Sequence, residues 1–179
     1  MEADLQAEQR FTLSAGKADE ALDKAGFTQQ ALSAADAMHR VASGILREAA
    51  DREDAVQQAL QKAWEKRHTL REPAYFDTWL IRILINECNS ILRVKKRVIP
   101  MDRLPETAQE GMPVITVRDA VMRLPKKQRL CVLLHYIEGW PTDKVARALK
   151  VPASTVRGRL YQARQALRLT LGEGEADEN

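Results

Sequence analysis

The chain has 179 residues, of which 45% are hydrophobic and 30% charged, with a net charge of +3; this composition excludes collagen, a mucin-like stalk and a wholly disordered chain. No apolar stretch reaches the ~18 residues of a membrane-spanning helix, and the acidic N-terminus lacks the apolar core of a secretory signal. The two cysteines and three histidines lack the spacing of a zinc site or a disulfide framework. We therefore expect a cytoplasmic protein without metal or cofactor.

The first half of the chain predicts an arm followed by three helices. Residues 1–26 are polar and rich in alanine, which indicates a frayed helix or a loose arm. Apolar residues spaced three or four apart predict helices over 27–49 and 51–67, the second with Asp51 as its N-cap. Residues 76–94 are apolar nearly all round and are long enough for a third helix.

A proline-rich linker precedes the second half. Residues 98–114 contain three prolines and a glycine, a composition typical of a domain boundary. Four further helices are expected, over residues 115–124, 128–138, 142–149 and 153–171. The predicted fold class is all-α, with two small helical bundles (27–97 and 115–171) joined by the linker and followed by an acidic tail at 172–179.

Positive charge is concentrated in the second bundle. Residues 115–171 hold twelve Lys and Arg against three Asp and Glu, whereas the tail holds four acidic residues and no basic one. A block of this charge usually binds a polyanion, and nucleic acid is the first candidate. A merely solvated basic surface is the alternative.

The pattern at the end of the basic block is that of a helix-turn-helix. A short helix, a turn at residues 150–152 and a longer helix follow one another. Val156, Leu160 and Ala163 form the apolar row of the longer helix. The candidate DNA-contacting residues lie on the opposite arc and its flanks: Ser154, Arg157, Gly158, Arg159, Tyr161, Gln162 and Arg164. Such a helix fits the major groove, where Arg pairs with guanine or phosphate and Gln with adenine.

A second polar line lies on the helix predicted over residues 76–94. Its members are spaced 4, 4, 3 and 4 apart and are Thr78, Arg82, Asn86, Asn89 and Arg93. Lys95, Lys96 and Arg97 extend it. Arginines beside neutral amides suit contact with bases and phosphates, although a solvated face explains the line equally well.

Two separate strings resemble the extracytoplasmic-function (ECF) sigma factors of the sigma-70 family. Residues 75–88 (YFDTWLIRILINEC) resemble the promoter-melting part of region 2, and residues 51–64 resemble the helix that grips the polymerase clamp. Residues 124–129 and 154–164 resemble the opening and the helix-turn-helix of region 4. The two unrelated strings occur in the order that the family has.

The resemblance implies a factor that binds core RNA polymerase and directs it to promoter DNA, with an anti-sigma factor as a further partner. Region 2 would read the −10 element through Arg82, Asn86, Asn89, Arg93, Lys95 and Lys96. Region 4 would read the −35 element through Pro152, Ser154, Thr155, Arg157, Gly158, Arg159, Tyr161, Gln162 and Arg164. Polymerase would contact Asp54, Gln57, Gln58 and Gln61. The loop from Arg67 to Phe76 would capture a flipped base.

The sequence departs from the family in the second bundle. Lys150 stands where the family usually has the glycine of the turn, so we expect a left-handed lysine there. Gly158 stands where serine is usual, and Gln162 replaces a common arginine. Trp64 and Trp79 lie on apolar rows and are expected in the core, although the resemblance also places Trp64 near polymerase.

Two other functions remain open at this stage. One is an autonomous helix-turn-helix regulator that binds palindromic duplex DNA without polymerase. The other is a helical adaptor or inhibitor whose basic face meets an acidic protein. An enzyme is not expected, because the sequence has no phosphate-binding loop, HExxH motif or nucleophile elbow.

Overall fold

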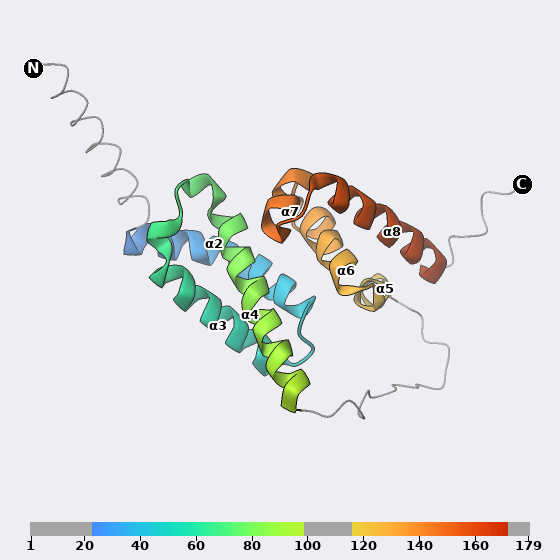
Figure 1. The fold of residues 1–179 in the computed structure, drawn as a ribbon, viewed down its shortest axis with the longest axis horizontal. Helices are drawn as coiled ribbons and strands as arrows, with labels where there is room; N and C mark the ends of the chain where they lie inside the picture. The colour runs from blue at the N-terminus through green and yellow to red at the C-terminus, as the bar shows by residue number, and fades with distance from the viewer. Residues whose placement is uncertain (1–22, 99–115, 172–179) are drawn as a thin grey trace, which may run out of the picture.

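The computed structural model describes residues 23–98 and 116–171, and within these residues every regular element is a helix (Figure 1). The all-α prediction is confirmed for this part of the chain. Most of the predicted arm, nearly all of the linker and the acidic tail lie outside the described residues.

Three helices form the first bundle: α2 (Lys24–Ser43), α3 (Ala49–Glu65) and α4 (Phe76–Val98). Two short 3-10 turns, Arg67–Thr69 and Pro73–Tyr75, connect α3 to α4. Each helix packs against the other two. Their apolar rows meet in a core that includes Met38, Val41, Ala55, Ala59, Leu80, Ile81 and Leu84, all fully buried. Burial of a large side chain of this kind contributes about 1.5–3 kcal/mol, so these rows fix the rotation of each helix.

Aromatic side chains close one end of this core. The ring of Phe27 packs edge-on against Trp64 and Phe76, with centroids 5.2 and 5.6 Å away. Trp79 lies 6.0 Å from Phe76. Both tryptophans are partly buried against the core, which confirms the structural role expected for them.

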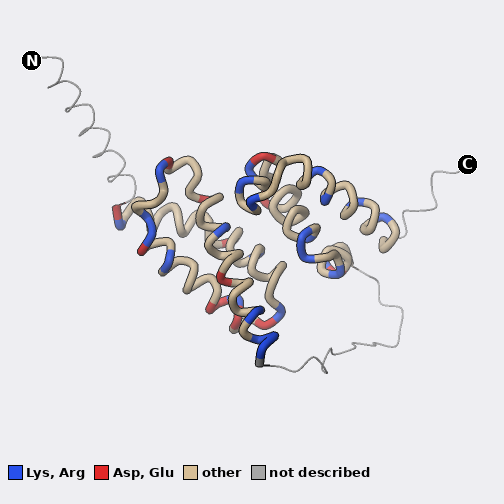
Figure 2. The backbone as a smooth tube through the Cα atoms, viewed as in Figure 1, with Lys and Arg blue, Asp and Glu red and all other residues tan. Residues whose placement is uncertain are grey.

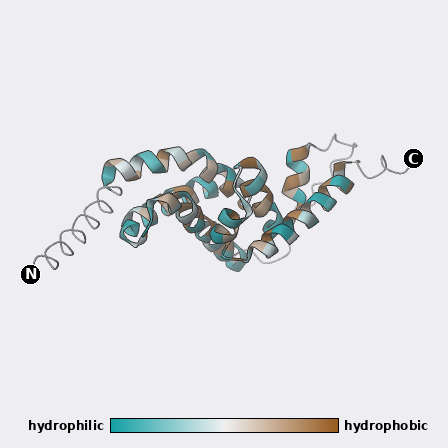
Figure 3. Ribbon diagram, turned by 90° about the horizontal axis from the view of Figure 1, so that it is seen from above, coloured by the Kyte–Doolittle hydropathy of each residue, from teal (hydrophilic) through white to brown (hydrophobic). Residues whose placement is uncertain are grey.

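The second bundle contains α5 (Val117–Arg123), α6 (Lys126–Val132), the π-helical turn η3 (Leu133–Ile137), α7 (Thr142–Leu149) and α8 (Ala153–Leu171). The long α8 packs on α5, α6 and α7. Apolar and polar stretches alternate along α8, as Figure 3 shows. The buried side chains of this bundle include Leu130, Cys131, Leu134 and Val145, together with Val156 and Leu160 of α8 itself.

Two helix ends differ from the sequence prediction. The first helix ends at Ser43 rather than at residue 49, since the chain turns at Gly44. Asp51 lies in the first turn of α3, whose N-cap is Glu48, so the predicted N-cap is wrong. Negative charge in a first turn still suits the helix dipole.

The start of α2 and the end of α6 also differ. The helix predicted from residue 27 begins at Lys24, because Asp23 caps it by accepting a hydrogen bond of 2.7 Å from the Gly26 amide. The helix expected over residues 128–138 begins at Lys126 and ends in the π-helical turn η3. His135 lies in this π-helical turn, and its Nδ1 donates a hydrogen bond to the Trp140 carbonyl at 2.7 Å.

The two bundles pack against each other, α4 against α7 and α2 against η3 (Figure 1). Glu138 accepts two hydrogen bonds from the Arg40 guanidinium, at 2.6 and 2.9 Å. Arg129 donates to the Gly44 carbonyl at 3.0 Å. Gly44 has no room for a side chain, because a Cβ atom there would overlap the Leu133 side chain of the other bundle. This contact between the bundles, called the seam below, therefore contains both ion pairs and close backbone packing.

Candidate nucleic-acid interface

The longest helix of the second bundle presents a cationic outer surface. The buried row of Val156, Leu160 and Ala163 fixes the rotation of α8. The opposite side therefore faces solvent, and the predicted contacts exposed there are Ser154, Arg157, Gly158, Tyr161, Gln162 and Arg164. Thr155 and Arg159 are partly buried, and Pro152 is exposed just before the helix. Figure 2 shows Lys and Arg recurring along α8. The structure thus brings the predicted −35 residues together on one helix.

The turn before α8 has the left-handed conformation that the sequence predicts. Lys150 has a φ of 52° and a ψ of 49°. Its amide bonds to the last carbonyls of α7, and the Val151 amide donates to the Ala146 carbonyl at 3.1 Å. This backbone ends α7 and directs the chain into α8, as a helix C-cap does.

Two of the predicted DNA contacts are held by neighbouring helices. The Gln162 amide oxygen accepts from Gln128 at 3.2 Å, and Arg164 donates to the Tyr136 hydroxyl at 2.9 Å. A Cβ atom at Gly158 would meet open space, so a side chain such as serine would fit there without displacing a neighbour.

The polar line on α4 is partly covered by the second bundle. The Arg82 guanidinium donates to the Arg147 carbonyl of α7 at 2.5 Å. Asn89 accepts a hydrogen bond from the Lys126 ammonium. Thr78 is 3% exposed, whereas Asn86 is exposed. Only part of the predicted −10 surface is therefore open to solvent in this arrangement.

The covered region extends to the loop before α4. Lys144 of α7 pairs with Asp77 at 3.2 Å. The Arg147 guanidinium lies over the Tyr75 ring, 4.8 Å from its centroid. Tyr75 nevertheless remains 39% exposed, so α7 covers this loop only in part.

The carboxyl end of α4 is cationic and largely open. Arg93 and Lys96 are exposed, and Figure 2 shows Lys and Arg gathered at this end of the helix. Lys95 differs, because it pairs with Glu48 at 3.0 Å and Asp51 at 2.5 Å. These hydrogen bonds, first to Asp51 and then to Glu48, raise the pKa of Lys95. Lys95 thus forms two ion pairs within the first bundle.

A third predicted surface lies on α3. The buried row of Ala55, Ala59 and Ala63 turns the opposite side of this helix to solvent. The exposed residues there are the four predicted polymerase contacts, Asp54, Gln57, Gln58 and Gln61. Trp64 differs, since it packs against Phe27 and under the Arg67 guanidinium, 4.1 Å from its ring centroid.

No local sequence pattern marks the residues that join the two bundles. Lys126, Lys144 and Arg147 belong to short helices and stand out neither by spacing nor by composition. Their partners lie more than 30 positions away in sequence, so no local pattern could identify them.

Within the described ranges 23–98 and 116–171, no cluster of His, Cys, Asp and Glu could hold a metal ion. Both cysteines are buried and free, and burial raises the pKa of Cys88 to about 11. No helix in the same ranges is long and apolar enough to span a membrane.

Comparison with protein families identifies both bundles. Residues 33–98 match Sigma-70 region 2, and residues 115–167 match Sigma-70, region 4. The ECF RNA polymerase sigma factor SigM of Mycobacterium tuberculosis is 34% identical over 140 residues, which is 75% of this chain and 71% of SigM. The RNA polymerase sigma-E factor of Streptomyces coelicolor is 28% identical over 148 residues, which is 79% of this chain and 84% of that protein.

Solved structures share the fold. The sigma factor RpoE from Bartonella quintana, in complex with the anti-sigma factor NepR, matches with a TM-score of 0.67 and 24% identity, over 84% of this chain and 98% of RpoE. CnrH, in complex with the cytosolic domain of CnrY, matches with a TM-score of 0.65 and 22% identity, over 92% of this chain and 97% of CnrH.

Proposed function

This chain belongs to the ECF sigma factors of the sigma-70 family, the transcription initiation factors that bind core RNA polymerase and promoter DNA, and from this we propose which of its surfaces performs each step. The observation that supports the assignment most strongly is the exposed cationic side of α8, fixed by its buried row and preceded by the left-handed turn. The functional units would be residues 27–97 and 115–171.

Recognition of the −35 element would fall to α8. Its amino-terminal half enters the major groove, with Ser154 and Thr155 at phosphates near the helix start, where free amides also attract anions. Arg157 and Tyr161 are exposed and carry the base contacts, with Gln162 beside them. Pro152, Gly158, Arg159 and Arg164 complete the surface.

Recognition of the −10 element would fall to α4 and the loop before it. Arg82, Asn86 and Asn89 lie on the side of α4 that meets the base edges of the separated strand, and Arg93, Lys95 and Lys96 lie toward its backbone. Because Arg82 donates a hydrogen bond to α7, we expect the two bundles to separate before the whole of this surface binds DNA.

Polymerase binding would fall to the exposed side of α3 that carries Asp54, Gln57, Gln58 and Gln61. This surface faces away from the seam between the bundles, so polymerase can bind the closed chain first. Polymerase supplies the chemistry, and we expect no catalysis by this chain. The site of action would be the cytoplasm, and an anti-sigma factor would be the regulatory partner.

The test is transcription from promoter DNA by core RNA polymerase with and without this protein. We expect promoter-dependent transcripts only when both are present, and no tight binding of the free protein to promoter duplex. Specific binding of a palindromic duplex without polymerase would instead indicate the autonomous regulator. Failure to bind either DNA or polymerase would rule out the proposal.

A further inference from the structure

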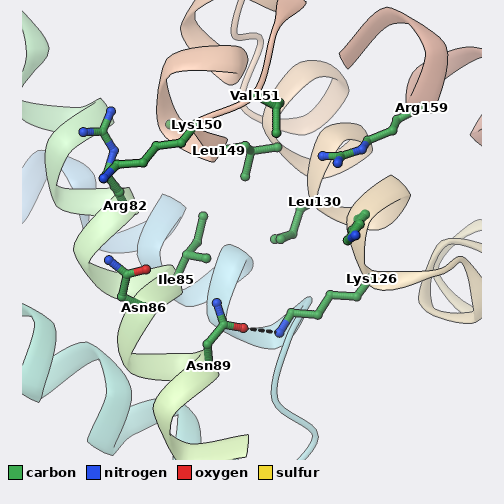
Figure 4. Close-up of a pocket in the computed structure, with 12 residues that line it drawn as sticks. Arg82, Ile85, Asn86, Asn89, Lys126, Leu130, Leu149, Lys150, Val151 and Arg159 are labelled. Atoms are coloured by element: carbon green, nitrogen blue, oxygen red, sulfur yellow. Dashed lines mark hydrogen bonds between the residues drawn. The ribbon is translucent and has the colours of Figure 1, made fainter. Parts of the chain in front are cut away.

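A cavity of about 500 Å³ lies between α4 and the second bundle (Figure 4). Its cations come from both bundles: Arg82 from α4, Lys126 and Lys127 from α6, Lys150 from the turn before α8 and Arg159 from α8. No Asp or Glu belongs to its lining, and none of the five cations forms an ion pair within the described residues.

The positive charge in this cavity is poorly compensated. Among the described residues, the hydrogen-bond partner of the Lys126 ammonium is the neutral amide of Asn89. Burial lowers the pKa of Lys126, which reflects the cost of desolvating its charge. The Arg82 Nε is buried without a partner. An anion that entered the cavity would meet cations that are already gathered, and one of them, Arg82, has a buried donor without a partner.

The cavity also has an apolar side. Ile85, Leu130 and Leu149 line it, and Figure 4 shows their side chains lying between Arg82 and Lys150 on one side and Lys126 and Arg159 on the other. The volume falls in the range of small-molecule sites, about 300–1,000 Å³. A ligand that combines several clustered negative charges with a flat apolar group would match both parts of the lining.

We propose that this cavity binds a nucleoside di- or triphosphate, with the phosphates among the cations and the base against the apolar side. Because the cations come from both bundles, the ligand binds the closed arrangement and stabilises it against separation. A DNA strand carries the same phosphate chemistry, but it needs α4 uncovered. Nucleotide and strand should therefore exclude each other.

The binding test uses the full chain and isothermal titration with GTP, inorganic triphosphate, guanosine and sulfate at constant ionic strength. We expect saturable one-to-one binding of GTP, weaker binding of triphosphate and none of guanosine or sulfate. Lys126→Gln and Lys127→Gln should each weaken GTP binding about tenfold, the usual effect of losing one charged hydrogen bond. Arg168→Gln removes the same charge from the exposed end of α8 and should leave GTP affinity unchanged.

Equal weakening by all three variants, or equal binding of sulfate and GTP, would show general attraction to a basic protein and overturn the proposal. So would a Lys126-dependent affinity for a short single-stranded oligonucleotide without any for GTP.

Closure is measured separately, by energy transfer between dyes at Leu32→Cys and Leu169→Cys, two strongly exposed positions on α2 and α8. GTP should raise the transfer, and an unchanged signal with bound GTP would contradict the stabilisation of the closed arrangement. These measurements need no polymerase, so their outcome is independent of the transcription test of the proposed function.

Discussion

Lys150 holds the left-handed backbone that joins α7 to α8, a conformation that costs a residue with a side chain about 1–2 kcal/mol. Glycine would adopt it without strain but would bring no charge. The lysine lines the cavity between the bundles, beside cations from both of them. At this position the chain thus has a charged side chain at the expense of local stability.

Replacement of this lysine tests the strain directly. Lys150→Gly should raise the free energy of unfolding by up to about 1 kcal/mol, because the relief of strain exceeds the entropy that glycine adds to the unfolded chain. Lys150→Ala removes the same charge but keeps the Cβ atom, so it should not stabilise the protein. Urea denaturation of the three proteins measures the difference, and equal stabilisation by alanine would assign the effect to charge.

Cys88 gives stability a dependence on alkaline pH. Its thiol is fully buried, and desolvation raises its pKa to about 11, whereas a thiol in an unfolded chain has a pKa of about 8.5. Between these values the unfolded state loses a proton that the folded state keeps, so stability falls as pH rises. Burial also raises the pKa of Cys131, which adds to the same trend.

The measurement is urea denaturation between pH 7 and 10.5, and Cys88→Ala should flatten the decline even though it lowers stability at pH 7. A decline of the same slope in the alanine variant would contradict this explanation. Below about pH 7 almost none of either thiol is ionised in either state, so no effect is expected there.

At the scale of elements, helices with long apolar rows were predictable and their ends often were not. The bounds of α8 agree with the sequence prediction, because Pro152 precedes the helix and its apolar row is unbroken. The end of α2 depends on the close approach of Gly44 to the second bundle, which no local pattern records. The π-helical turn η3 likewise has no signature in its residues.

The assignment of α8 as the −35 reader predicts an asymmetry between two arginines of the same helix. Arg157→Ala should cost about 1–3 kcal/mol in binding of the polymerase complex to promoters with the preferred −35 sequence, and less with a scrambled −35 sequence. Arg168→Ala, at the far end of the helix, should have little effect on either. Competition binding measures both, and equal losses on the two sequences would remove Arg157 from base recognition.

At the scale of the whole molecule, the predicted DNA surfaces were identified from sequence but their relation in space was not. The sequence placed one cationic row on α4 and one on α8. The structure leaves the row on α8 exposed and covers part of the row on α4 with α7. The contacts responsible join isolated residues of different bundles, such as Arg40 and Glu138, which have no periodicity to reveal them.

This seam can be opened and restored by charge exchange. Glu138→Arg faces Arg40 with a like charge and should separate the bundles, because it replaces the paired carboxylate at 2.6 Å by repulsion. The double variant Arg40→Glu/Glu138→Arg should restore closure. Energy transfer between dyes at positions 32 and 169 should fall in the single variant and recover in the double one. A single variant that stays closed would show that the ion pair does not hold the seam.

The unequal exposure of α8 and α4 bears on the order of events at a promoter. A free chain with α8 exposed can scan intact double helix, yet it is poorly placed to hold an unpaired base while Arg82 is bonded to α7 and Arg147 lies over the Tyr75 ring. The search for a promoter and the opening of its strands are therefore separated in time. A free chain that meets transiently separated DNA strands elsewhere in the genome would not keep them apart.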